Sequence, residues 1–220
     1  MTLIEAVVVI FIIAFLALVF LPATYSGPNR RPYRISCINN QKQLILAYKI
    51  WAGDNQGKYP MEISATNGGA LELMNTADAW KVFQVMSNEL STPKVIYCPS
   101  DSLPGNAATN WGDDLKNKIS YFIGLDATET NPAAILSGDG NFLLNNAPAN
   151  YGFVNVATNA TLAWDTTRHF GESKQGWFTK TRTGSGNIGL ADGSVQGLSN
   201  AGLAQQLQQT GFASNRFFIP

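Results

Sequence analysis

Hydrophobic residues are distributed unevenly along the 220-residue chain, and the longest apolar run stands at its start. Every residue from Ala6 to Leu21 is apolar, and Leu3 and Ile4 extend the run towards the N-terminus. With the residues that flank it, the run reaches the roughly 20 residues that a helix needs to cross a hydrocarbon core. The pattern therefore predicts a hydrophobic helix over residues 1–22, either membrane-spanning or buried in a bundle.

One acidic residue, Glu5, lies within this run and separates three interpretations of it. A secretory signal peptide would carry a positive n-region and a small-residue cleavage site, whereas the first charge here is negative. A plain membrane anchor would leave the carboxylate unpaired, at a cost of about 2.5–3.5 kcal/mol if it lies deep in the bilayer. In the third interpretation, a second chain supplies the opposite charge.

Proline and glycine follow the apolar run and oppose a continuous helix. Pro22, Gly27, Pro28 and Pro32 remove backbone donors, clash with the preceding turn or add backbone entropy. We therefore predict an extended linker over residues 23–33.

Beyond the linker, apolar positions recur at helical spacing. Leu44, Tyr48 and Trp51 lie on one face, so the pattern predicts an amphipathic helix from about residue 34 to Gly53. The turn formers from Asp54 onwards end it. Its apolar face is expected to pack on a sheet.

The rest of the predicted head, residues 34–220, contains short helices and then strands. The expected elements are a helix at 77–90, strands at 94–98, 119–125, 151–156 and 160–165, a hairpin at 186–199, a helix capped by Ser199 and closed by Gly211, and a docked tail at 212–220. Two glycine-rich stretches, 137–141 and 181–187, lack the ending of a phosphate loop and read as turns. This order predicts the α+β class with an antiparallel sheet.

The first fourteen residues, MTLIEAVVVIFIIA, resemble the mature N-terminus of type IV pilins and type II secretion pseudopilins. The match covers Thr2, Leu3, Ile4 and Glu5. The resemblance implies that a prepilin peptidase has removed a leader and that Met1, where the family usually has phenylalanine, is the processed and N-methylated first residue. It also implies that Glu5 pairs with the Met1 ammonium of a neighbouring subunit in a helical homopolymer.

Three further stretches indicate which group of pilin-like proteins the chain resembles most. Arg-x-Ser-Cys at 34–37, Tyr-Cys-Pro-Ser-Asp at 97–101 and a His169…Asp192-Gly193 pair are similar to the large-headed prepilin-type proteins of planctomycetes and verrucomicrobia. The spacing from His169 to Asp192 is longer than is usual in that group. The resemblance implies the pilin fold, in which the amphipathic helix lies on an antiparallel sheet.

The head of a pilin lies outside the cytoplasm, where disulfides persist. The resemblance therefore favours a disulfide between Cys37 and Cys98, with two separate buried thiols as the alternative. Asn159 begins an Asn-Ala-Thr sequence that fits a glycosylation acceptor.

Composition excludes several kinds of chemistry. A net charge of zero gives no basic footprint for nucleic acid. Two cysteines and one histidine offer little for a metal cage or a nucleophile–base pair, so we expect no enzyme. No cofactor is expected. Calcium in the head stays open, because five aspartates lie in expected loops but lack the alternating pattern of a calcium loop; they are Asp101, Asp113, Asp114, Asp139 and Asp165.

These observations lead to two hypotheses. The first is a structural subunit of a type IV pilus-like or type II secretion pseudopilus-like filament, held in the bacterial inner membrane before assembly and extracellular or periplasmic afterwards. Its partners would be identical subunits and the inner-membrane assembly machinery. The alternative is a single-pass membrane-anchored binding protein whose head stacks a ligand or carbohydrate on Trp111, Trp164 and Trp177.

Overall fold

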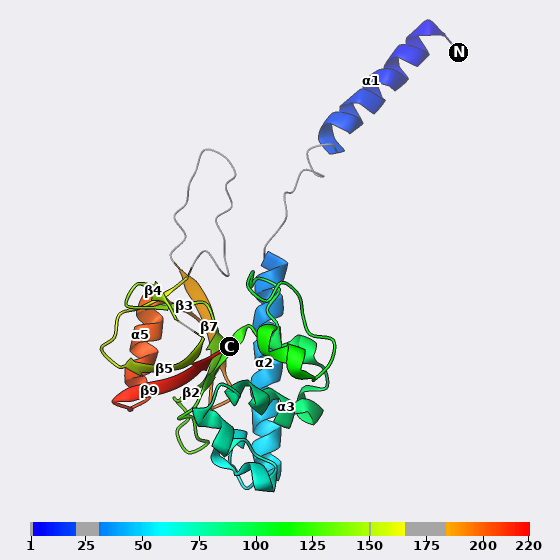
Figure 1. The fold of residues 1–220 in the computed structure, drawn as a ribbon. Coiled ribbons are helices and arrows are strands. Elements are labelled where there is room, and N and C mark those ends of the chain that lie inside the picture. Colours follow the sequence, from blue (N-terminus) through cyan, green and yellow to red (C-terminus); the bar gives the residue numbers. More distant parts are fainter. Residues whose placement is uncertain (1, 21–30, 150, 166–183) are drawn as a thin grey trace. The chain divides into compact units, whose positions relative to one another are not determined.

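The computed structural model of the chain describes residues 2–20, 31–149, 151–165 and 184–220 (Figure 1). Its contacts divide the chain into two compact units, residues 1–32 and 33–220, and each is described by itself.

Helix α1 (Leu3–Phe20) forms the first unit's regular structure. Its sequence contains no glycine or proline, so nothing interrupts the backbone hydrogen bonds. The helix lies within the predicted span of 1–22, of which residues 1, 21 and 22 are outside the described part of the chain. Among the residues that the structure describes, no helix is long and apolar enough to cross a membrane.

Helix α2 (Arg31–Asp54) begins earlier than the sequence predicted. Residues 31–33, assigned to the extended linker, belong to the helix, because proline is tolerated in a helix's first turn, where its missing N–H has no partner to lose. The predicted end is confirmed. Gly57 has φ +74° and donates its N–H to the carbonyl of Ala52 at 2.8 Å, which closes the last turn.

The head contains two sheets, and every strand pair in them is antiparallel. The larger has the order β5-β9-β1-β2-β7-β8 and the smaller has the order β4-β3-β6. The strands are β1 (Tyr121–Gly124), β2 (Ile135–Asp139), β3 (Phe142–Leu144), β4 (Ala147–Pro148), β5 (Gly152–Ala157), β6 (Leu162–Trp164), β7 (Ser185–Leu190), β8 (Val195–Ser199) and β9 (Ser214–Ile219). The α+β class with an antiparallel sheet is therefore confirmed.

Short helices fill the connections. They are η2 (Pro60–Glu62), η3 (Ala65–Asn67), η4 (Leu71–Asn75), η5 (Ala79–Lys81), α3 (Val82–Val85), α4 (Ser87–Leu90), η6 (Pro93–Ile96), η7 (Asp113–Asn117) and α5 (Asn200–Gln209), where η marks a 3₁₀-helix.

The larger sheet has a hydrophobic core on each face. Tyr121 and Ile123 of β1 belong to the core that contains the buried side of α2, whereas Phe122 between them belongs to the core that contains α5. This alternation follows from the two-residue period of a strand. α2 approaches β7 closely, since a Cβ atom at Gly189 would collide with the Ile45 side chain.

Two predicted elements are wrong in type or continuity. Residues 94–98 do not form a strand: Pro93 starts η6, and Thr92 caps it by accepting a hydrogen bond from the Lys94 N–H. The helix predicted at 77–90 is divided into η5, α3 and α4, with the break at Met86 (φ −90°, ψ 20°).

The turns predicted at 137–141 and 181–187 are wrong in part. Ser137–Asp139 complete β2, and the last three residues of the second stretch, 185–187, start β7. Glycine is required in β2 because a Cβ atom at Gly138 would collide with the Phe122 ring. Asp139, expected in a loop, is therefore a buried strand residue.

Several predicted elements are confirmed. β1, β5 and β6 lie at the expected strands, and β7 and β8 form the hairpin around Asp192-Gly193. Ser199 caps α5 by accepting from the Gly202 N–H, and Gly211 follows it with φ +74°. The tail docks as β9, between β5 and β1.

Candidate functional site

The first candidate site is the start of α1. The Thr2 N–H donates to Glu5 Oε2 at 2.8 Å, and the Thr2 carbonyl accepts from the Glu5 N–H at 3.1 Å. This is the reach-back half of a capping box, which satisfies one of the backbone donors that a helix leaves unpaired at its start. A carboxylate there also interacts favourably with the helix dipole. Glu5 remains exposed.

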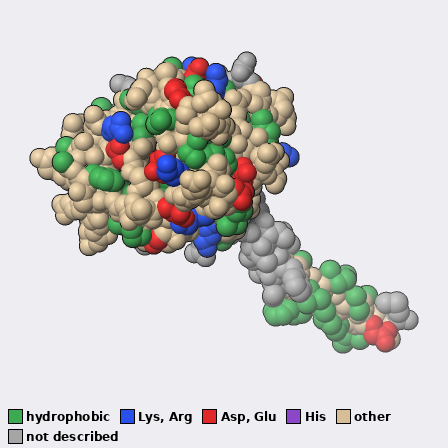
Figure 2. All heavy atoms as spheres, turned by 90° about the horizontal axis from the view of Figure 1, so that it is seen from below, with side chains coloured by type: hydrophobic (Ala, Val, Ile, Leu, Met, Phe, Trp, Pro, Cys, Tyr) green, Lys and Arg blue, Asp and Glu red, His purple; other side chains and the backbone are tan. Residues whose placement is uncertain are grey.

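The rest of α1 exposes large apolar side chains around the helix, and Figure 2 shows hydrophobic side chains along the face of α1 in view. Its large side chains are exposed to different degrees, from Leu3 at 85% and Phe11 at 73% to Leu16 at 47%. A helix that is hydrophobic all round is normally buried. The single chain thus presents a helix that needs an apolar partner.

Several predicted site residues lie outside the described part of the chain. They are Met1, Pro22, Gly27, Pro28, His169 and Trp177. The predicted processing, linker and His169 pairing therefore stay predictions.

The predicted disulfide between Cys37 and Cys98 is confirmed. Their Cα atoms lie 4.8 Å apart, and both residues are buried. Two hydrogen bonds lie beside it: Asn40 Nδ2 donates to the Tyr97 carbonyl at 2.7 Å, and the Tyr121 hydroxyl donates to the Cys37 carbonyl at 3.1 Å. Together these contacts fix the first half of α2 to the segment after η6 and to β1.

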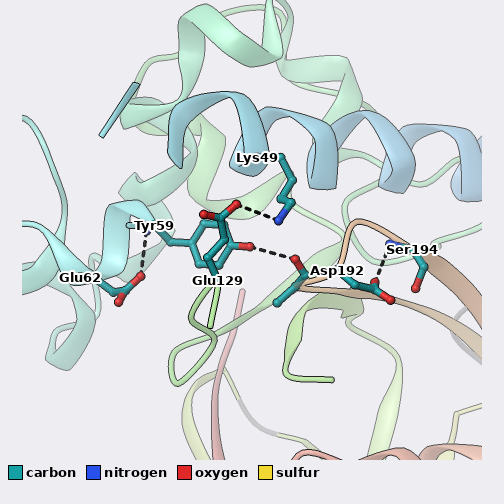
Figure 3. Close-up of polar contacts among 7 residues, drawn as sticks. Lys49, Tyr59, Glu62, Glu129, Asp192 and Ser194 are labelled. Carbon is teal, nitrogen blue, oxygen red and sulfur yellow. Dashed lines mark hydrogen bonds and ion pairs between the residues drawn. The ribbon is translucent and has the colours of Figure 1, made fainter. Parts of the chain in front are cut away.

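The loop after α2 is fixed to the Asp192-Gly193 hairpin by a cluster around Tyr59 (Figure 3). The Tyr59 hydroxyl donates to the Ala191 carbonyl at 3.2 Å, and its N–H donates to Glu62 Oε2 at 2.8 Å. Asp192 Oδ1 accepts from the Ser194 N–H at 2.8 Å, which holds the hairpin turn.

A salt bridge completes this cluster. Lys49 Nζ on α2 lies 2.8 Å from Glu129 Oε1 in the loop after β1, with both side chains about one third exposed. A Cβ atom at Gly57 would lie only 2.9 Å from Glu129 Oε2, so the turn after α2 passes close to this carboxylate. The arrangement links four segments of the head: α2, the loop that follows it, the loop after β1 and the Asp192-Gly193 hairpin.

The cluster also keeps the Tyr59 hydroxyl protonated. Burial raises the pKa of Tyr59 far above its usual range, and the charges of Glu129, Glu62 and Asp192 raise it further. Burial does the same to the pKa of Tyr48, whose ring packs edge-on against that of Tyr59 at 5.9 Å between centroids. Both phenols are therefore neutral, and that of Tyr59 donates the hydrogen bond to Ala191, which suits a structural role.

A second polar group lies between α2 and the sheet. Asp139 Oδ2 accepts from both the N–H and the Nδ2 of Asn187, at 2.8 and 2.9 Å, and Gln41 Nε2 donates to the Asn187 carbonyl at 3.3 Å. All three residues are buried. Burial, followed by the charges of Asp139 and Asp101, raises the pKa of nearby Tyr121 well above its usual value.

Sequence reasoning missed this group and the Tyr59 cluster. Asp139 lies in a Gly-Asp-Gly sequence that is typical of turns, and only the preceding Ala-Ala-Ile-Leu indicates a strand. Tyr59 lies between a turn and Pro60, where the hydrophobic pattern carries no signal.

The question of calcium in the head, left open by the sequence, concerns five aspartates. Within the described ranges, no group of three or more histidine, cysteine or acidic residues is placed to hold a metal ion. Asp114 Oδ2 forms a salt bridge with Lys118 Nζ at 3.0 Å, and Asp139 accepts a hydrogen bond from the Asn187 side chain.

The structure describes two of the three tryptophans of the proposed stacking platform, since Trp177 lies outside the described residues. Trp164 is buried and Trp111 is half-buried. One open polar cavity of about 340 Å³ lies along the loop after α2, with a lining that contains no aromatic side chain: Asp54, Asn55, Gln56, Lys58, Glu62, Ile63, Ser64 and Asn67. It offers hydrogen bonds but no ring face for a sugar. Asn159, the predicted glycosylation acceptor, is exposed in the turn after β5.

No protein-family model, no curated protein and no solved structure matches this chain.

Proposed function

We propose that the protein is the structural subunit of a filament of the type IV pilus or type II secretion pseudopilus kind, in which copies assemble through their α1 helices. The observation that carries the proposal is a helix exposing apolar side chains on every side, with a single carboxylate, Glu5, in its first turn.

The energetics of α1 favour a bundle. Each large apolar side chain that becomes fully buried contributes about 1.5–3 kcal/mol, and α1 carries many of them. Neighbouring copies of the same helix supply matching apolar surface without any further partner. Burial in such a bundle would also remove Glu5 from water.

The carboxylate then sets the register of the subunits. A buried charge without a partner is strongly destabilising, whereas a matched pair recovers much of that cost. The proposed partner is the Met1 ammonium of a neighbouring copy. Only subunits at one axial position relative to each other bring the Glu5 carboxylate and the Met1 ammonium together. The pair therefore selects one arrangement among many that bury similar apolar area.

The head is consistent with this role. α2 lies on an antiparallel sheet, and the Cys37–Cys98 disulfide joins it to the segment after η6. A disulfide suits a head that lies outside the cytoplasm. The proposal therefore includes processing by a prepilin peptidase, an inner-membrane stage and a final location outside the inner membrane, all of which rest on the sequence resemblance. It includes no catalytic activity.

The proposal is tested by negative-stain microscopy of material sheared from cells that produce the full chain, with mass spectrometry of its N-terminal residue. We expect thin filaments made of this protein that begin with a methylated Met1. A chain found only as isolated copies in detergent-extracted membranes would favour the anchored binding protein and overturn the proposal.

A further inference from the structure

Among the described residues, neither edge strand of the larger sheet carries a charge or a proline, and neither pairs with a further strand. Within the described residues, β5 pairs only with β9 and β8 pairs only with β7. Sheets generally protect such edges with charges, proline or a covering segment. The sequences here, Gly-Phe-Val-Asn-Val-Ala and Val-Gln-Gly-Leu-Ser, contain no charged residue and no proline.

The β9 contacts show which β5 groups point outward. The Arg216 carbonyl accepts from the Leu125 N–H at 2.9 Å, and the Arg216 N–H donates to Asp126 at 2.8 Å, so both groups point away from β5. Asn155 is the residue opposite Arg216. In an antiparallel ladder, its N–H and C=O must therefore point to the outer side, and those of Phe153 must do the same.

The hairpin contacts give the same information for β8. The Leu190 N–H donates to the Ser194 carbonyl at 2.9 Å, so this pair is hydrogen-bonded across the hairpin. Bonded pairs alternate along the ladder. Gly197, which lies opposite Asn187, belongs to a non-bonded pair and points its N–H and C=O outward.

The residues of β5 and β8 whose main-chain groups point outward have their side chains on the same face of the sheet. Phe153 packs edge-on against Phe218, which belongs to the core on the α2 side. Asn187, opposite Gly197, lies two residues before Gly189, whose Cβ atom would meet Ile45 of α2, so Asn187 faces the α2 side. Residues directly opposite each other share a face, so Gly197 is also on the α2 side.

The strand directions match as well. Six strands with antiparallel neighbours place β5 and β8 in opposite directions. A second copy in the same orientation therefore presents its β8 antiparallel to the β5 of the first. A heterologous contact of this kind does not close, because each added copy leaves one β5 edge and one β8 edge available.

We propose that the outer edge of β5 pairs with the outer edge of β8 in a second copy of this chain, which joins adjacent heads by main-chain hydrogen bonds. The proposal rests on the proposed function, since a polymer with all helices pointing the same way needs contacts between heads in one orientation. Strand addition supplies such contacts without charge complementarity.

The test is cross-linking of the full chain in intact cells, with Asn155→Cys and Gly197→Cys in the same chain. Both native cysteines form the disulfide, so only the introduced thiols react with a short bismaleimide. We expect a ladder of dimers, trimers and larger species from the double variant and no ladder from either single variant. The matched control pairs Asn155→Cys with Gln205→Cys on the exposed side of α5, and no ladder is expected from it.

The outcomes separate this inference from the proposed function. Filaments without a ladder would overturn the edge pairing and leave the filament proposal intact. A ladder without filaments would support the edge pairing and overturn the filament proposal. Dimers from Asn155→Cys alone would show that β5 pairs with β5 and would also overturn the inference. Ala157→Cys with Val195→Cys repeats the test at adjacent outward positions should the first pair disturb the fold.

Discussion

The hydroxyl of Tyr59 donates a hydrogen bond to the main-chain carbonyl of Ala191, which lies 132 positions later in the chain, at 3.2 Å. Both residues are buried. The contact joins the loop after α2 to the main chain directly before the Asp192-Gly193 turn.

This contact predicts that Tyr59→Phe destabilises the head while leaving its shape unchanged. The Ala191 carbonyl would lose its buried donor, and such a loss costs about 1–3 kcal/mol. Urea unfolding measures the change in the free energy of unfolding. Tyr151→Phe is the matched control, since the Tyr151 hydroxyl also donates to a carbonyl, that of Ala77, but is exposed. Equal losses in the two variants would contradict the account.

The disulfide predicts a second stability effect. Replacing Cys37 and Cys98 by alanine removes a cross-link between positions 61 apart, and removing a native disulfide from a small secreted domain typically costs about 2–5 kcal/mol. Thermal unfolding of the oxidised protein, the reduced protein and the double variant measures this. The reduced protein and the variant should unfold at similar, lower temperatures; an unchanged melting temperature would show that the bond contributes nothing.

The buried aspartate predicts a larger loss than a surface aspartate with similar bonds. Asp139→Ala leaves the two N–H donors of Asn187 without their acceptor, at about 1–3 kcal/mol for each buried donor. Asp126 also accepts from one residue, Arg216, through its main-chain N–H and its guanidinium, but at the surface, where ion pairs contribute about 0–1 kcal/mol. Urea unfolding of Asp139→Ala and Asp126→Ala should therefore rank them in this order, and the reverse ranking would contradict the assignment.

The buried tyrosines predict alkaline unfolding. Tyr48, Tyr59 and Tyr121 have pKa values raised above the usual value of about 10, chiefly by burial. Above that pH the unfolded chain releases these protons and the folded chain retains them, so the stability present below about pH 10 falls as the pH rises. Tyrosinate absorbance should rise together with unfolding. Ionisation of these phenols near pH 10 in a folded protein would contradict the prediction, and Tyr48→Phe should make the pH dependence less steep.

Local signals in the sequence predicted part of this fold well. The Asp192-Gly193 turn between two apolar runs and the Ser199 cap each depend on a few adjacent residues, so the pattern was sufficient. The pairing of Cys37 with Cys98 came from the family resemblance.

Other elements depend on contacts that the local pattern does not contain. β2 reads as a turn because of its glycine and aspartate, yet Gly138 is needed against Phe122, and Asp139 is bonded to Asn187 of the next strand. The strand predicted at 94–98 has β-branched and aromatic residues, but Pro93 and the Thr92 cap favour a 3₁₀-helix. Tertiary contacts outweighed propensity in the first case, and capping did so in the second.

The role of Glu5 is the central claim, and the structure supplies a competing explanation, because Glu5 also caps its own helix through Thr2. Glu5→Gln separates the two, since glutamine can still accept the Thr2 N–H but carries no charge. The measurement is the number of filaments sheared from cells that produce Glu5→Gln or the unchanged chain at equal levels. We predict that Glu5→Gln accumulates as subunits without filaments, because the Met1 ammonium has lost its partner. Filaments at the level of the unchanged chain would show that Glu5 is a helix cap and would contradict the account.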